Sequence, residues 1–160
     1  MPFLVPIFAK RLQENFDPKS PLFKKHAETN PPFAKAWSEA VKAGAQTVVF
    51  PKTATIDAAE KAMYGQLLGS SHKSDSGGNT LAGSIHTFAI TCATGVIVAV
   101  PAMQGVPPPG PPPIQSVFPA GTPATATNIQ LIMQLGAVLA SWFPTGMSIN
   151  ISSGVPVPWA

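Results

Sequence analysis

The last 85 residues of the chain, Ser76–Ala160, contain no Lys, Arg, Asp or Glu, and all seventeen charged side chains lie between Lys10 and Asp75. A protein that is free in solution normally keeps charged groups on its surface, because they favour solvation and oppose association. The cores of protein–protein interfaces are depleted in Lys, Glu and Asp. We therefore expect neighbouring protein subunits to cover the uncharged half. The alternatives are a surface solvated by uncharged polar side chains and a surface covered by lipid.

The composition predicts an ordered chain with one modest core. Hydrophobic residues make up 45% of the 160 residues and charged residues 11%, whereas about a quarter of an average globular protein is charged. Disordered segments show the opposite composition, with many charges and few apolar residues. The expected organisation is an N-terminal arm and connector over residues 1–30, followed by a helical domain over residues 31–160.

Apolar periodicity predicts a mainly α fold, a small helical domain of about four helices. They are expected at about residues 33–44, 56–69, 81–100 and 129–143. Thr55 is a suitable N-cap for the second helix, and Gly69 ends it. In the third segment the apolar residues have helical spacing, but β-branched residues after Thr91 also favour a strand. A helix is the preferred interpretation of this segment, and a strand is the alternative.

Extended segments complete the predicted fold. Residues 2–16 predict either a short amphipathic helix or an apolar arm interrupted by Pro6, and residues 17–32, with four prolines, predict an extended connector. The segment 106–114 (VPPPGPPPI) predicts a polyproline II rod. It is interpreted as a stiff spacer along the protein's own surface, with a ligand for an aromatic-lined groove as the alternative. Residues 147–160 predict an extended C-terminal arm.

No group of residues predicts catalysis, a cofactor site or a metal site. His26, His72 and His86 share no metal-ligand spacing. His86 and Cys92 are six residues apart, about 120° around a helix, so that a Cys–His nucleophile pair is not expected. Residues 76–80 (SGGNT) precede a helix as phosphate-binding loops do, but they lack the Lys of a P-loop. The chain is therefore not expected to be an enzyme.

Neither nucleic acid nor a membrane is the expected partner. The densest basic positions, Lys10–Arg11 and Lys24–Lys25, are too sparse for the striped basic face of a nucleic-acid binder. The uncharged stretch Leu81–Val100 has about the length of a membrane span, but Thr, Ser, His and Gly lower its hydropathy. A small membrane protein with one or two spans, involved in lysis or associated with the envelope, is the alternative function.

Five short motifs resemble a group of small structural (virion) proteins of tailed bacteriophages. They are PFAKAW at 32–37, TATIDAAEKAM at 53–63, VPPPGP at 106–111, SWF at 141–143 with Thr-Gly at 145–146, and VPVPW at 155–159. The resemblance covers most of residues 30–160. It departs from the group in having fewer helical alanines and a long loop over 70–80. It implies a component of the head, neck, tail or baseplate that is repeated by symmetry, and it carries over no catalytic residue.

The expected function is therefore that of a structural subunit of a viral particle. Its partners would be other virion proteins and further copies of the same chain in a symmetric assembly, and its location the virion. Aromatic and apolar residues of the arms and of the last helix are the expected contacts with neighbouring subunits. They are Phe3, Phe8, Trp142, Phe143, Val155, Val157 and Trp159.

Overall fold

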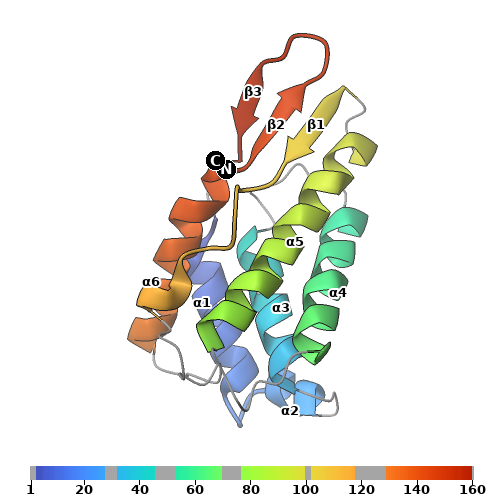
Figure 1. The fold of residues 1–160 in the computed structure, drawn as a ribbon. Helices are drawn as coiled ribbons and strands as arrows, with labels where there is room; N and C mark the ends of the chain where they lie inside the picture. Colours follow the sequence, from blue (N-terminus) through green and yellow to red (C-terminus); the bar gives the residue numbers. More distant parts are fainter. Residues whose placement is uncertain are drawn as a thin grey trace.

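The computed structural model describes residues 3–27, 32–45, 53–69, 77–99, 102–117 and 129–159. Within these ranges the protein consists of six α-helices and one small antiparallel sheet of three strands (Figure 1). The helices are α1 (Val5–Phe16), α2 (Pro21–Ala27), α3 (Pro32–Ala45), α4 (Thr53–Gly69), α5 (Gly77–Ala99) and α6 (Ile129–Trp142). The strands are β1 (Met103–Val106), β2 (Met147–Asn150) and β3 (Pro156–Pro158). The predicted mainly helical class is confirmed.

The segment for which the sequence allowed either a helix or a strand, residues 81–100, is helical through Ala99 as part of α5. Its apolar residues with helical spacing are all buried: Leu81, Ile85, Phe88 and Cys92. The threonine hydroxyls are accommodated within the helix, since Thr87 donates to the Gly83 carbonyl at 3.1 Å and Thr91 to the Thr87 carbonyl at 2.9 Å. Burial on one side and these bonds along the other outweigh the β propensity of the branched residues.

The predicted extended connector over residues 17–32 is wrong, because residues 21–27 form α2. The Ser20 hydroxyl accepts a hydrogen bond from the backbone N–H of Leu22 at 3.2 Å, as an N-cap residue does. Pro21 occupies the first helical position, where the missing N–H costs nothing. Proline here starts a helix, whereas the sequence interpretation took it as part of an extended connector.

The chain before α2 is also helical, and α1 settles the choice between a helix and an apolar arm. Pro6 lies in its first turn, where proline is tolerated. Its buried residues include Phe8, Leu12 and Asn15, and α1 packs against both α3 and α6. The described part of residues 1–30 therefore shares one core with the rest of the chain.

The C-terminal segment differs from the extended arm that was expected. β2 and β3 form an antiparallel hairpin, and β2 also pairs with β1, which gives the strand order β1-β2-β3. Trp159 ends the hairpin inside the core, where its indole is buried. The segment folds back because a tight loop after Asn150, with Gly154 at φ 68°, reverses the chain.

The core joins the charged and the uncharged halves of the sequence. α3 and α4 pack on each other, α4 packs on α5, and β1 runs beside α5 (Figure 1). Phe3 near the N-terminus stacks on Phe143 after α6, with ring centroids 5.1 Å apart. Trp37 of α3 is the largest fully buried side chain. Burial in the chain's own core therefore accounts for much of the apolar content of residues 76–160.

Candidate interaction surface

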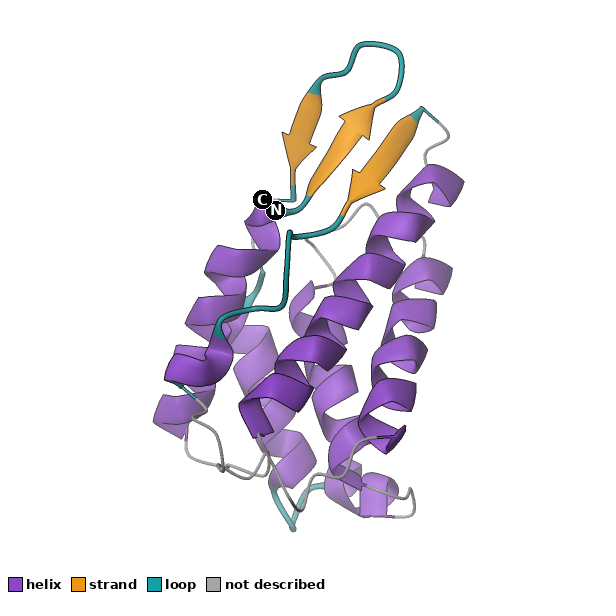
Figure 2. Ribbon diagram, viewed as in Figure 1, coloured by secondary structure: helices purple, strands orange, loops and turns teal. Residues whose placement is uncertain are grey.

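The three-stranded sheet stands at one end of the helices, with the loop between β2 and β3 at its tip (Figure 2). Successive side chains of a strand point to opposite faces of the sheet. One face is directed at α5, because a Cβ added to Gly105 would lie 2.2 Å from the Ala93 carbonyl oxygen. Ser148, opposite Gly105 in the register, is buried and accepts a hydrogen bond from the Trp159 indole N–H at 3.1 Å. We call this the inner face.

The opposite face carries the residues that alternate with these, and we call it the outer face. The register places Val106 and Pro158 on either side of Met147, and Gln104 and Pro156 on either side of Ile149. All of them are at least partly exposed. An antiparallel sheet with one face toward solvent normally alternates apolar and polar residues. Gln104 is the only polar side chain on this face, so that the outer face is mainly apolar.

The loop at the tip of the hairpin is held by its own hydrogen bonds. The Asn150 side-chain oxygen accepts bonds from the Ser152 N–H at 3.0 Å, the Ser152 hydroxyl at 2.7 Å and the Ser153 N–H at 3.1 Å. The Gly154 N–H donates to the Asn150 carbonyl at 2.8 Å. This loop presents Ile151 with 56% of its surface exposed, an apolar side chain on a defined turn.

The seven expected contact residues fall into two groups. Val155 and Val157 of the hairpin are 55% and 40% exposed. The other five are buried in the core of the chain itself: Phe3, Phe8, Trp142, Phe143 and Trp159. The sequence interpretation missed the outer face as a unit, because only the strand register shows that Met147 and Ile149 share a side with Val106.

The segment 106–114 lies along the protein's own helices. The Pro108 carbonyl is hydrogen-bonded to His86 Nε2 of α5 at 3.1 Å, and the Gly110 carbonyl accepts a bond from Trp142 Nε1 of α6 at 2.9 Å. Pro108 and Pro112 are buried. These contacts agree with a segment packed on the protein's own surface, and they give His86 a structural partner.

The most connected group of charged side chains lies between α3 and α4. Glu60, almost entirely buried, pairs with Lys35 and with Lys42, the latter at 2.7 Å. Lys42 also pairs with Asp57 at 2.6 Å. Burial opposes ionisation of Glu60, but hydrogen bonds from the two lysines outweigh it and lower its pKa. The same balance, burial against bonds to Asp57 and Glu60, raises the pKa of Lys42. Satisfied ion pairs of this kind join two helices and leave no free group for acid–base chemistry.

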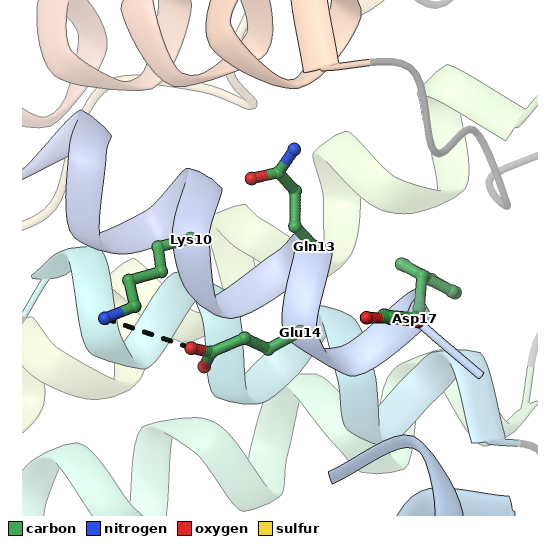
Figure 3. A pocket seen from close by; sticks show the side chains of 5 residues that line it. Lys10, Gln13, Glu14 and Asp17 are labelled. Carbon is green, nitrogen blue, oxygen red and sulfur yellow. Dashed lines mark ion pairs between the residues drawn. The ribbon is translucent and has the colours of Figure 1, made fainter. Parts of the chain in front are cut away.

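A hollow of about 420 Å³ lies beside α1 (Figure 3). Lys10 and Glu14 point toward each other across it at 4.0 Å, while Gln13 points away from the pair. The Lys10 side chain is 78% exposed, so that this is a solvated surface pair of small energetic value. The remaining lining residues are Phe16 and Asp17. Among the described residues that line this hollow, no nucleophile lies beside a base.

The other candidates for chemistry are equally isolated. Cys92 is buried in α5, and burial raises the pKa of its thiol to about 12, which suppresses the reactive thiolate. Gly77–Thr80 form the first turn of α5, while Ser76, His72 and the side chain of His26 lie outside the described residues. Within the described ranges, no three His, Cys, Asp or Glu side chains lie close enough together to hold a metal ion.

None of the helices, as far as the chain is described, combines the length and the apolarity that a membrane span requires. The longest, α5, is the stretch that the sequence had suggested as a span. Comparison of the chain with protein-family models, with curated proteins and with solved structures found no match.

Proposed function

We propose that the protein is a non-enzymatic structural subunit of a larger assembly, a component of a tailed-phage particle that holds neighbouring subunits together. The observation that carries the proposal is the three-stranded sheet, which belongs wholly to the uncharged half of the sequence and is apolar on the side turned away from the helices. The hairpin of β2 and β3 also carries three of the eight large apolar side chains that are exposed in the described residues: Ile151, Val155 and Val157.

The structure suggests which part of the surface would make the contacts. Much of the uncharged half serves the core, and its aromatic residues Phe143 and Trp159 are buried. The contacts are therefore assigned to the hairpin and to the outer face. Exposed apolar patches on a folded protein are typical of interaction sites, and uncharged ones are typical of interface cores.

Mass spectrometry of purified particles from the source of the sequence tests the proposal. We expect the chain in intact particles after washing at high salt, in a fixed copy number, because a contact made by apolar surface is insensitive to screening. The copy number distinguishes a ring of a few copies from a shell component with many. Absence of the chain from the particles, or its recovery in the membrane fraction, would refute the assignment.

A matched pair of variants tests whether the hairpin makes the contact with neighbouring subunits. Ile151→Lys places a charge on the loop at the tip of the hairpin, and Ile90→Lys makes the same change at an exposed position of α5, where the isoleucine is 41% exposed. In cells that supply tagged copies of each, we expect the Ile151 variant to be depleted from particles and the Ile90 variant to enter them as the wild type does. If both variants enter particles equally well, the hairpin is not part of the contact.

A further inference from the structure

We propose that a basic hollow between α1, α2 and α3 binds an acidic segment of a second, different protein through its carboxylates. The basic hollow measures about 240 Å³ and is lined by Arg11, Leu22, Lys25, Glu39, Lys42 and Ala43. It lies on the helices of the charged half, and α2 is at the end of the molecule away from the sheet (Figure 1). The proposal therefore goes beyond the proposed function, which assigns contacts to the hairpin and the outer face.

The net charge of the chain is concentrated around the basic hollow. Residues 10–25 hold five of the ten cations and two of the seven anions, which accounts for the whole net charge of +3. The other five cations are balanced by the other five anions. Glu28 follows this segment outside the described residues, and with it counted, five cations still face three anions. The positive potential on α1 and α2 favours an anionic partner at this place.

The fold brings together basic positions that are apart in the sequence. Lys10–Arg11 belongs to α1 and Lys24–Lys25 to α2, and α2 packs against both α1 and α3 (Figure 1). Arg11 and Lys25 consequently line the same hollow, together with Lys42 of α3. Three cations from three helices thus meet at one concave surface, although the sequence shows only two separate basic pairs.

Two of the three cations are available to an anion from outside. Lys42 is already paired with Asp57 and Glu60. By contrast, none of the carboxylates in the described ranges forms an ion pair with Arg11 or Lys25. Arg11 is half-buried, so that water screens its charge less than that of a fully exposed side chain. A guanidinium binds a carboxylate through two parallel hydrogen bonds, and the ammonium group of Lys25 adds a third donor group.

The remaining lining residues favour a carboxylate over a phosphate. Leu22 and Ala43 give the hollow an apolar wall, on which the CH₂ groups of an aspartate or glutamate lose contact with water. Glu39 brings one negative charge into the lining, and it repels a phosphate of up to two charges more than a carboxylate of one. A nucleic acid presents a phosphate at every nucleotide and is bound along an extended basic stripe. Two free cations in a small hollow match a short acidic segment better.

A second copy of this chain is a poor source of the acidic segment. Residues 76–160 contain no Asp or Glu. Four of the five carboxylates in the described residues pair with lysines of their own chain: Glu14, Glu39, Asp57 and Glu60. The fifth, Asp17, accepts a hydrogen bond from the Lys19 N–H at 2.9 Å. The chemistry therefore points to a different protein, one with acidic residues that its own fold leaves unpaired.

Fluorescence anisotropy of a labelled peptide tests the binding. The probe is a fluorescein-labelled Gly-Ser peptide with four glutamates, titrated with the purified full chain up to about 1 mM in about 20 mM salt, where screening is weak. We expect saturable binding that the double variant Arg11→Gln/Lys25→Gln weakens by about 10-fold or more, because hydrogen bonds to charged groups are the strong ones. The same peptide with glutamine in place of glutamate should not bind.

The matched control is the double variant Lys19→Gln/Lys61→Gln. Both lysines are exposed and neither lines the basic hollow, so that the control loses the same net charge at other places and should bind as the wild type does. Equal weakening in the two double variants, or a wild type that binds no peptide, overturns the proposal. A DNA duplex or inorganic phosphate that binds more tightly than the peptide, and loses affinity in Arg11→Gln/Lys25→Gln, also overturns it and assigns the hollow to phosphate.

Carbodiimide coupling of the peptide to the wild type tests the position without any substitution. The reagent joins a carboxylate to a lysine amine that lies in contact with it, and peptide mass spectrometry locates the modified lysine. We expect Lys25 to be the main site of coupling, with little at Lys19 and Lys61. Coupling spread evenly over the exposed lysines would overturn the proposal.

The outcomes separate this site from the proposed function. The peptide measurements use the purified chain, and the binding should weaken as salt is raised, whereas the apolar contact in particles should not. If the chain is found in particles but binds no acidic peptide, the basic hollow is not a binding site and the structural role stands. If it binds the peptide at Lys25 while particles lack the chain, the site stands and the virion assignment fails.

Discussion

The contact between β1 and α5 determines which side of the sheet is the outer face, and replacing Gly105 by alanine tests it directly. A Cβ at this position would lie 2.2 Å from the carbonyl oxygen of Ala93, and 2.7 Å and 2.8 Å from its Cα and carbonyl carbon. All three are backbone atoms of a helix, which cannot rotate away as the end of a flexible side chain can. The strand must move away from α5, or the helix must bend.

The expected cost follows from two opposing effects. Overpacking a tight contact costs about 1–3 kcal/mol, and a clash with rigid backbone belongs at the upper end of that range. Gly→Ala also reduces the entropy of the unfolded chain, which returns about 0.4–1 kcal/mol. We expect Gly105→Ala to lower the free energy of unfolding by about 2 kcal/mol. For a domain of this size that is a fall in melting temperature of about 4–8 °C.

Urea unfolding followed by circular dichroism measures this difference, and Gly110→Ala is the matched control. A Cβ at Gly110 has no atom within 4 Å, so that the same substitution there should change the free energy of unfolding by less than about 0.5 kcal/mol. Equal stabilities of the two variants would refute the packing of Gly105 on α5. The assignment of the outer face would fail with it.

Four further predictions concern the core and the ion pairs. Because the pKa of Glu60 is lowered in the folded state, the contribution of Glu60 to stability is complete above its ordinary pKa of 4.5 and is lost as the pH falls below that value. Glu60→Gln should therefore reduce the loss of stability at acid pH, measured as melting temperature between about pH 3 and pH 7. The pKa of Lys42 is raised, so that its contribution is kept below 10.5 and lost as the pH rises above it, and Lys42→Met should remove that alkaline loss. Trp142→Phe removes the 2.9 Å hydrogen bond to the Gly110 carbonyl and should lower the free energy of unfolding, measured in urea, by about 1–2 kcal/mol. The Cys92 thiol, with its pKa at about 12, should react with a thiol reagent only after denaturant is added.

Several helices could be predicted from local patterns alone. The apolar spacing of α3 and α6 predicted both elements, and α6 begins at Ile129 as expected. In α4 the predicted cap at Thr55 lies two residues inside the helix, which starts at Thr53, because the ends of helices depend on few residues. α2 was missed since a proline gives the same local signal whether it ends a helix or begins one.

The sheet and the candidate surface needed the tertiary structure. β1 and β2 are separated by about forty residues, and no short-range pattern states that Met103 pairs with Asn150. The aromatic residues Phe143 and Trp159 were expected at contacts between subunits, yet they are buried in the chain itself. Hydropathy shows that such a residue must leave water. It does not distinguish the chain's own core from a neighbour's surface.

The sequence by itself determined the segregation of charge and the helical periods, since both depend only on residue type and spacing along the chain. The tertiary structure decided which apolar residues are used up in the core and which remain outside. A one-residue change of register would exchange the two faces of the sheet. The packing of Gly105 against α5 and the burial of Ser148 select the face that carries Met147 and Ile149 as the outer one.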